Sequence, residues 1–306
     1  MTTFRWIASL VPTLTIVVPL LAESHCPGNA ASLSFRLVNG YQIVVPVSIN
    51  HSGPYDFLLD TGTQMTILAP SLADELHLNA EGAAVVEGAG FQQSASPAKL
   101  ELLEAGSYAV SNQKALVYRL LNLRSVDSRI RGILGEDFLE HFDVLIDHAH
   151  KRLCLDDSGS MGARIKGLHI PLVTPAQAEN EATLPRLLII EARLSGETGP
   201  VRLMLDSGAN IPYLYNTSQR LAPQATSFGG RSLVGSGADG DHKVFSALPP
   251  QKVKIGSLEL PEITFLTLAY PRKKSSTSKF DGLLTMNLFR AVFISYSGQF
   301  VVLEPR

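Results

Sequence analysis

The chain has 306 residues, of which 45% are hydrophobic and 18% are charged, and its formal net charge at pH 7 is −2. This length is sufficient for a substantial core and favours two domains over one. A charge so close to neutral gives no basic field, which argues against nucleic acid as a partner. The 24 glycines and 18 prolines are typical of a turn-rich β protein.

The N-terminus begins with a basic residue, Arg5, and an apolar stretch over residues 6–22 that two prolines interrupt. The stretch is short for a membrane-spanning helix. Together with the small Ala22 it predicts a secretory signal peptide over residues 1–22, and hence a secreted or periplasmic protein. The alternative is an uncleaved segment, so that the chain contacts a membrane only through residues 6–22.

Two cysteines, Cys26 and Cys154, lie beyond the predicted cleavage point. In an exported chain they can form one disulfide that ties the N-terminal tail to the end of the first half. The alternative, given equal weight, is a pair of free thiols, one in a loop and one in a strand.

The first half predicts an unstructured lead over residues 23–31 and then a series of short strands. Asn39-Gly40 is a strong hairpin signal between the first two. A short helix is expected at 70–78, where a proline stands at the start. The expected strands are 32–38, 41–50, a strand ending at Asp60, 64–68, 99–103, 108–118, 143–147 and 152–155.

A polar segment rich in Gly and Ser at 156–166 marks a boundary, after which the order of elements begins again. We therefore expect a first domain over 32–156, a linker over 157–167 and a second domain over 168–306. The segments 174–183 and 271–279 are expected to be a polar insertion and a solvated loop. The expected strands are 168–173, 187–194, a strand ending at Asp206, 253–260, 263–269 and a closing hairpin over 292–303.

One motif occurs in both halves: an apolar run, an Asp, a small hydroxyl residue and a Gly. It reads Phe57–Thr63 in the first half and Leu203–Ala209 in the second, and a Gly-Pro pair precedes each Asp by seven residues. A single copy would be typical of a strand that runs into a turn. Two copies with matched surroundings indicate an internal repeat of about 145 residues that spans nearly all of the mature chain.

Two other features recur in each half after the Asp motif. The first is a Gly-rich tip between extended stretches, which suits a mobile hairpin; these residues are Glu87, Gly88, Ala89, Gly90 and Phe91, and Gly235, Ser236 and Gly237. The second is an apolar loop, Ile133-Leu134-Gly135 in the first half and Asp281-Gly282-Leu283-Leu284 in the second.

Two similar β units in one chain tend to pack about a pseudo-twofold axis. If the two motif loops face each other across it, Asp60 and Asp206 lie side by side, and such a pair holds one proton over a wide pH range. One carboxyl can then accept a proton from a water molecule while the other gives a proton to a substrate carbonyl. The Gly-rich tips would fold over a cleft and hold an extended peptide.

With these motifs the chain, over about residues 32–303, resembles the retropepsin-like aspartic proteases, and in particular a bacterial family with two fused domains. The resemblance implies an all-β fold in which two retropepsin-type β-barrel domains form a bilobal, pepsin-like arrangement with pseudo-twofold symmetry. It implies that Asp60 and Asp206 are the catalytic dyad and that Thr61 and Ser207 donate reciprocal hydrogen bonds. Gly62, Thr63 and Gly208 would support the dyad, and residues 86–91 and 234–240 would be flaps.

The chain departs from the family pattern at two positions. Thr285 follows the apolar pair of the second half, where the family usually has Gly, and its side chain could crowd the loop that carries Asp206. Ala209 stands where the first half has Thr63, and in the family a hydroxyl there supports the carboxylate. Asp60 is therefore expected to be the more acidic of the two.

The expected function is that of an exported aspartic endopeptidase that acts on peptides or unfolded proteins as a monomer, without a metal or another cofactor. The alternative is a catalytically weak or inactive pseudoprotease that keeps the cleft and binds peptides. His148 and His150 could chelate a metal, but on a hairpin turn without a nearby carboxylate cluster we favour surface turn residues. The sequence around Ser236 has the wrong spacing for a serine-hydrolase elbow.

Overall fold

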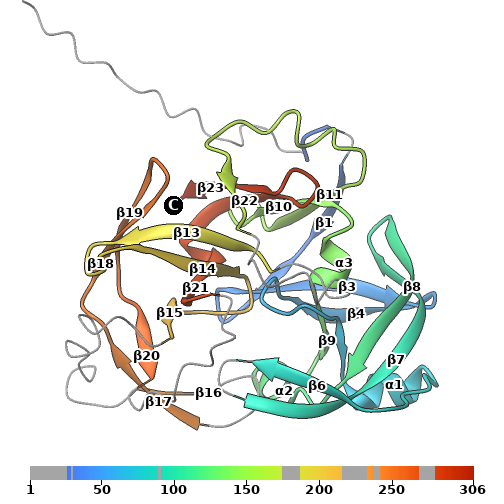
Figure 1. Ribbon diagram of the computed structural model, residues 1–306. Helices are drawn as coiled ribbons and strands as arrows, with labels where there is room; N and C mark the ends of the chain where they lie inside the picture. Colours follow the sequence, from blue (N-terminus) through green and yellow to red (C-terminus); the bar gives the residue numbers. More distant parts are fainter. Residues whose placement is uncertain are drawn as a thin grey trace, which may run out of the picture.

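The computed structural model describes residues 26–28, 30–88, 91–173, 187–215, 233–236, 242–268 and 280–306. The predicted signal peptide, the insertion at 174–183 and the loop at 271–279 lie outside these residues. The described part of the chain consists mainly of β-strands, in the bilobal arrangement expected from the sequence. Figure 1 shows one lobe on the right, the other on the left, and a sheet above both to which each half contributes. No helix among the residues described is long and apolar enough to span a membrane.

The first lobe is built on an eight-stranded sheet in the order β2-β3-β4-β9-β5-β8-β7-β6, and an extra pairing of β3 with β7 curls it towards a barrel. Its strands are β2 (Arg36–Val38), β3 (Gln42–Ile49), β4 (Ser52–Leu59), β5 (Ile67–Leu68), β6 (Ala84–Gly88), β7 (Phe91–Ala105), β8 (Tyr108–Val117) and β9 (Ile130–Leu134). Its helices are α1 (Pro70–Glu75), α2 (Leu121–Val126) and α3 (Glu136–Leu139).

The second lobe is built on a nine-stranded sheet in the order β16-β17-β20-β15-β21-β14-β13-β18-β19. Its strands are β13 (Ile189–Leu194), β14 (Pro200–Asp206), β15 (Tyr213–Leu214), β16 (Leu233–Ser236), β17 (His242–Ala247), β18 (Gln251–Ile255), β19 (Leu258–Ile263), β20 (Leu266–Leu268) and β21 (Gly282–Thr285). A 3-10 turn, η3 (Met286–Leu288), follows β21 and corresponds to α3 of the first lobe.

The two lobes share one pattern of strand pairing around their centres. In the first, β4 runs parallel to β9, which pairs antiparallel with β5, and β5 runs parallel to β8. In the second, β14, β21, β15 and β20 repeat these pairings in the same order. The repeat read from the sequence is thus also a repeat of topology.

A six-stranded sheet joins the two halves of the chain, in the order β1-β11-β10-β22-β23-β12. Its strands are β1 (Ala31–Ser34), β10 (Asp143–Asp147), β11 (Arg152–Asp156), β12 (Ile170–Pro171), β22 (Phe289–Ser295) and β23 (Phe300–Pro305). The central pairing is antiparallel and brings Leu145 opposite Phe293, both fully buried. The closing hairpins of the two halves therefore form one continuous layer.

Turn chemistry explains where several strands begin and end. Asn39 and Gly40 have φ angles of 52° and 80°, as the tight hairpin between β2 and β3 requires. The expected single strand over 253–260 was wrong: β18 ends at Ile255 and β19 begins at Leu258, because Gly256 with φ 58° allows a turn between them. Helix α2 and strand β17 were not expected.

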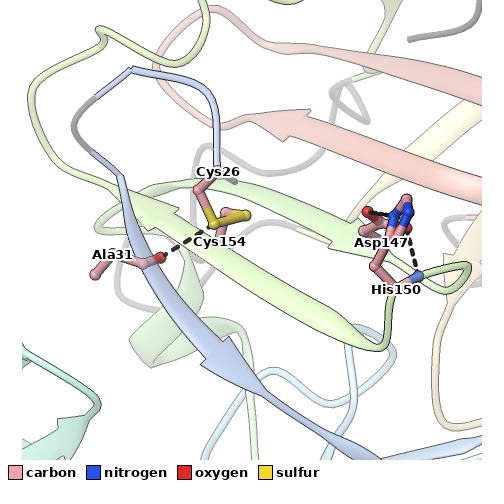
Figure 2. Close-up of a disulfide and its surroundings, with 5 residues drawn as sticks. All are labelled: Cys26, Ala31, Asp147, His150 and Cys154. Atoms are coloured by element: carbon pink, nitrogen blue, oxygen red, sulfur yellow. Dashed lines mark hydrogen bonds and ion pairs between the residues drawn. A yellow bond between two sulfur atoms is a disulfide. The ribbon is translucent and has the colours of Figure 1, made fainter. Parts of the chain in front are cut away.

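The disulfide that the sequence left open is formed between Cys26 and Cys154 (Figure 2). Cys154 lies in β11, and Cys26 lies a few residues before β1, the strand at the edge of the six-stranded sheet. The bond therefore fastens the first described residues to the sheet that joins the lobes.

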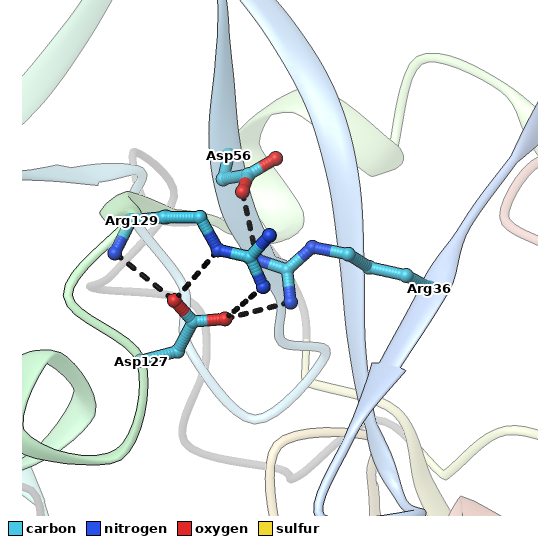
Figure 3. Close-up of polar contacts among 4 residues, drawn as sticks. All are labelled: Arg36, Asp56, Asp127 and Arg129. Atoms are coloured by element: carbon cyan, nitrogen blue, oxygen red, sulfur yellow. Dashed lines mark hydrogen bonds and ion pairs between the residues drawn. The ribbon is translucent and has the colours of Figure 1, made fainter.

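A charged network holds the outer side of the first lobe together (Figure 3). The guanidinium of Arg36 in β2 donates to Asp56 in β4 at 2.7 Å and to Asp127, just after α2, at 2.8 Å. Arg129 also donates to both oxygens of Asp127, at 3.0 and 2.9 Å. Hydrogen bonds from Arg129 lower the pKa of Asp127 below its ordinary value, although its burial opposes this.

Candidate active site

Asp60 and Asp206 each stand at the end of a buried strand beside a second buried strand. Leu59 at the end of β4 pairs with Leu134 of β9, and Leu205 in β14 pairs with Leu284 of β21; all four leucines are fully buried. Apolar residues on both faces explain why the strands pack into the lobe centres. They place each Asp where the chain turns out of the core.

The loops that follow the two aspartates are joined by four hydrogen bonds between the lobes. The Thr61 hydroxyl donates to the Leu205 carbonyl at 2.9 Å, and the Ser207 hydroxyl donates to the Leu59 carbonyl at 2.8 Å. Each hydroxyl oxygen also accepts the backbone N–H of the other residue, at 3.1 Å for Thr61 N–H and 3.0 Å for Ser207 N–H. Because Thr61 and Ser207 are buried, these bonds are shielded from competition with water.

The two glycines of the motifs let each loop approach the opposite carboxyl group. A β-carbon on Gly62 would lie 2.8 Å from Cγ of Asp206, and one on Gly208 would lie 2.6 Å from Cγ of Asp60. A β-carbon cannot lie so close to a carboxyl group that its own hydrogen bonds hold in place. Only Gly therefore fits at these two positions. The reciprocal contacts show that Asp60 and Asp206 face each other across the junction of the lobes.

Each carboxyl group accepts hydrogen bonds from its own loop, but the two sets differ. Asp60 accepts the Gly62 N–H on Oδ1 at 2.8 Å and the Thr63 hydroxyl on Oδ2 at 2.7 Å. Asp206 accepts the N–H groups of Gly208 and Ala209 at 2.8 and 2.9 Å, both on Oδ1. Asp60 thus has a donor on each oxygen from its own loop, whereas both loop donors of Asp206 reach one oxygen.

This difference decides which carboxyl holds the shared proton. Burial raises the pKa of both groups. For Asp206 the negative charge of Asp60 raises the pKa further, whereas the Thr63 hydroxyl and the Gly62 N–H oppose the rise for Asp60. A hydrogen bond between the two carboxyls lowers the pKa of Asp60 and raises that of Asp206. These contacts therefore favour a proton on Asp206 and an ionised Asp60.

The site is also reachable from outside. Asp60, Gly62, Thr63 and Gly208 are partly exposed, and Asp206 keeps 9% of its surface exposed. The site thus combines buried interlobe hydrogen bonds with loop residues that keep part of their surface exposed.

The two predicted flaps belong to antiparallel hairpins, only part of which the structure describes. Glu87 and Gly88 end β6, and Gly88 pairs with Phe91 of β7, while Ala89 and Gly90 lie outside the described residues. Gly235 and Ser236 lie in β16, which pairs with β17, and Gly237 lies outside the described residues. In Figure 1, β6 and β16 are at the lower edge, on the side away from the six-stranded sheet.

Thr285 is accommodated in the second lobe through a rearranged loop. In the first lobe the Glu136 N–H donates to the Thr63 carbonyl at 2.9 Å, and a β-carbon on Gly135 would lie 2.8 Å from that same carbonyl oxygen. In the second lobe Thr285 is fully buried and its hydroxyl donates to Oδ1 of Asn287 at 2.5 Å. The Asn287 amide in turn donates to the Asn210 carbonyl at 3.2 Å, so a side chain bridges to the loop that carries Asp206.

Two supporting residues of the first lobe, Thr66 and Asp137, were not expected from the sequence. Oδ1 of Asp137 accepts the Thr66 N–H at 2.9 Å and its hydroxyl at 2.7 Å, and the Gly135 N–H donates to the Thr66 hydroxyl oxygen at 3.3 Å. Burial raises the pKa of Asp137 to about 6. An acidic pair after Gly135, within an otherwise apolar run, is the signal that could have identified it.

The two histidines of the β10–β11 turn do not behave alike. His150 lies close to Asp147, with 2.6 Å between Nδ1 and Oδ2 (Figure 2). The expectation of a surface residue was wrong for His148, which is only 7% exposed; burial and the charge of Arg306 lower its pKa to about 4. Among the residues described, no group of three or more potential ligands is arranged to hold a metal ion.

Comparisons with known proteins bear on the family and the fold. The family model described as aspartyl protease matches residues 45–138, which include Asp60. An aspartic proteinase from Irpex lacteus has a similar structure, with a TM-score of 0.52 and 13% identity, over 90% of this chain and 97% of that one. A retropepsin-like aspartic protease from Rickettsia conorii aligns with 42% of this chain and 94% of its own, with 20% identity and a TM-score of 0.33.

No curated protein gives a significant match to the chain in sequence. The fold likeness to the fungal enzyme extends over both lobes, whereas the family model covers a part of the first. The resemblance to aspartic proteases that the sequence indicates is thus confirmed, in a chain with the bilobal fold of pepsin-like enzymes.

Proposed function

We propose that the chain is an exported aspartic endopeptidase in which Asp60 and Asp206 activate a water molecule for the hydrolysis of peptide bonds. The observation that carries this proposal is the reciprocal contact of the two motif loops, in which each glycine lies against the carboxyl of the other lobe. A single structural carboxylate could be held by its own loop. Two that share a proton at an accessible junction are arranged for acid–base chemistry.

In the proposed reaction, water attacks the carbonyl carbon of the peptide bond as ionised Asp60 takes its proton. Protonated Asp206 gives its proton to the carbonyl oxygen, so a neutral tetrahedral diol forms without a covalent bond to the enzyme. Asp60 then gives the proton that it gained to the amide nitrogen, while ionised Asp206 takes a proton from one hydroxyl of the diol. The C–N bond breaks as the carbonyl re-forms, and the dyad returns to its single shared proton. Asp60 begins ionised and Asp206 begins protonated, as their hydrogen bonds favour. The proposed reaction uses these two carboxyls and no metal or cofactor.

The substrate would be an extended peptide or an unfolded protein, held beneath the β6–β7 and β16–β17 hairpins by backbone hydrogen bonds. The proposed lobes are residues 32–156 and 168–306, joined by 157–167, and a monomer suffices because one chain supplies both aspartates. The Cys26–Cys154 disulfide supports export, because such bonds persist in oxidising compartments.

The test is cleavage of an unfolded protein at acid to neutral pH, with and without a statine-type inhibitor. We expect Asp60→Asn and Asp206→Asn each to lower the rate by at least about a hundredfold, because each removes one partner of the proton transfers. Asp74→Asn, at an exposed position of α1, is the matched control and should cleave at the wild-type rate. Equal activity of all three variants would refute the assignment.

The same experiment addresses the alternative of a peptide-binding pseudoprotease, which the departure at Thr285 motivates. A pseudoprotease would bind the inhibitor and leave the unfolded protein intact. Binding of the inhibitor together with cleavage that the Asn variants lose would exclude it.

A further inference from the structure

Close to the dyad, the first lobe buries a further carboxyl group, which the proposed reaction does not use. Glu136 begins α3, immediately after Gly135, and its side chain is fully buried. Neither of its carboxyl oxygens has a hydrogen-bond partner within normal geometry. A buried, unpaired carboxylate is costly, so this group is expected to be neutral.

Among the residues described, the charged groups that act on Glu136 are all acidic. The carboxylates of Glu140, Asp60 and Asp137 act on it, and each raises its pKa in addition to the effect of burial. The group that opposes this is the hydroxyl of Tyr296, which lies next to the carboxyl and is itself buried without another partner. Burial is the main cause that raises the pKa of the Tyr296 hydroxyl, and Glu136 and Glu140 raise it further.

Glu136 and Tyr296 come from different halves of the chain. Tyr296 follows β22, whose last residue, Ser295, pairs with Asp143 of β10 across the centre of the six-stranded sheet. The end of this strand from the second half therefore reaches α3 of the first lobe. The two polar groups meet in an apolar region where the halves join.

The second lobe shows that the fold does not need an acid at this position. Its equivalent of Glu136, after the apolar pair and Thr285, is Met286, which is also fully buried. Methionine fills the position with an apolar side chain at no electrostatic cost. The acid is thus specific to the first lobe.

The backbone of Glu136 is connected directly to the support of Asp60. Its N–H donates to the Thr63 carbonyl at 2.9 Å, and the Thr63 hydroxyl donates to Asp60 at 2.7 Å. A displacement of the first turn of α3 would therefore move the residue that stabilises ionised Asp60.

We propose that Glu136 is a positioning residue: in its neutral form it pairs with Tyr296 across the junction of the halves and fixes the loop that carries Thr63 and Asp60. Ionisation would place a further negative charge in a buried position beside Asp60 and Asp137. The protonation of Glu136 would thereby set an upper pH limit for the ordered site. The effect on catalysis rests on the proposed function, whereas the pairing of Glu136 with Tyr296 does not.

The first test measures how many protons the folded chain exchanges on unfolding, and needs no activity. An acid whose pKa is raised by folding ionises first in the unfolded state, so stability falls as pH rises from the ordinary pKa of Glu, about 4.3, towards the raised value. In Glu136→Gln, urea unfolding followed between pH 4 and 8 should show about one proton fewer released on unfolding than in wild type. Glu262→Gln, at an exposed position of β19, is the control and should match wild type.

Activity provides a second reading of the same variants. Glu136→Ala should lower kcat about tenfold at every pH, and Glu136→Gln should restore it and move the alkaline limb of the pH profile up by about one pH unit. Tyr296→Phe should lower kcat in the same direction as Glu136→Ala. An unchanged pH profile and unchanged proton release in Glu136→Gln would overturn the proposal.

A measurement on the wild-type chain covers the case in which the variants do not fold. Carbon NMR of a sample labelled at the glutamate carboxyls should show one carboxyl that stays neutral after all the others have ionised. If all glutamates ionise in the ordinary range, the proposal is wrong. Loss of cleavage in every variant and in wild type would refute the proposed function but leave the proton-release and NMR results to decide the role of Glu136.

Discussion

At the scale of single residues, the two aspartates are distinguished by one hydroxyl group. Thr63 gives Asp60 a donor on Oδ2, whereas the equivalent Ala209 offers only its backbone N–H, which goes to Oδ1 of Asp206. A charged acceptor gains more from a donor than a neutral one does. The sequence difference between Thr63 and Ala209 therefore favours ionised Asp60 and protonated Asp206.

We expect Thr63→Ala to raise the pKa of Asp60, because the ionised form loses a donor while the neutral form loses little. A hydrogen bond to a charged group contributes about 1.5–3 kcal/mol, so the acidic limb of kcat/KM should move up by about one pH unit. The profile of cleavage against pH measures this directly. Thr198→Ala, at an exposed turn, is the control. An acidic limb that stays in place would show that Thr63 does not set the acidity of the dyad.

At the scale of elements, the site depends on two parallel strand pairs, β4 with β9 and β14 with β21. The loops that follow β4 and β14 hold the two pairs together. Thr61 and Ser207 each donate to a backbone carbonyl of the opposite lobe and accept an N–H from it. Since all of these groups are buried, the loss of one hydroxyl leaves two backbone groups without partners.

Thr61→Val keeps the shape of the side chain and removes its hydroxyl, which leaves the Leu205 carbonyl and the Ser207 N–H unpaired. Each unpaired buried group costs about 1–3 kcal/mol, so the free energy of unfolding should fall by about 2–5 kcal/mol. Urea unfolding measures this change, and cleavage should decrease with it because the loops lose their alignment. Thr198→Val should leave stability unchanged. If Thr61→Val were equally stable, the interlobe bonds would not be essential to the fold.

The elements differ in how far the sequence predicts them, and the reason is the range of the interactions involved. The Asn39-Gly40 hairpin, the closing hairpins and the doubled Asp loops are specified by turn chemistry and by short apolar runs, which are local signals. The break between β18 and β19 was missed because alternation continues on both sides of Gly256. The proximity of Glu136 and Tyr296 involves residues far apart in the chain, which no local pattern encodes.

At the scale of the whole molecule, the lobes are held by a sheet to which both ends of the described chain contribute. Its edge strand β1 belongs to the N-terminal segment, while β22 and β23 come from the C-terminus. β1 has four residues and pairs along one side with β11. The Cys26–Cys154 bond adds a covalent attachment next to this short strand.

The whole-molecule prediction concerns this disulfide, which closes a loop with a sequence separation of 128 residues. Replacement of both cysteines by serine should lower the free energy of unfolding by about 2–5 kcal/mol, because the unfolded chain is no longer cross-linked. Urea unfolding of the double variant and of each single variant measures it, and all three should be destabilised to a similar extent. Cleavage below the unfolding transition should persist, since none of the residues that bond to Asp60 or Asp206 lies in β1 or β11. Unchanged stability under reducing conditions would show that the cysteines do not tie the N-terminal segment to the sheet.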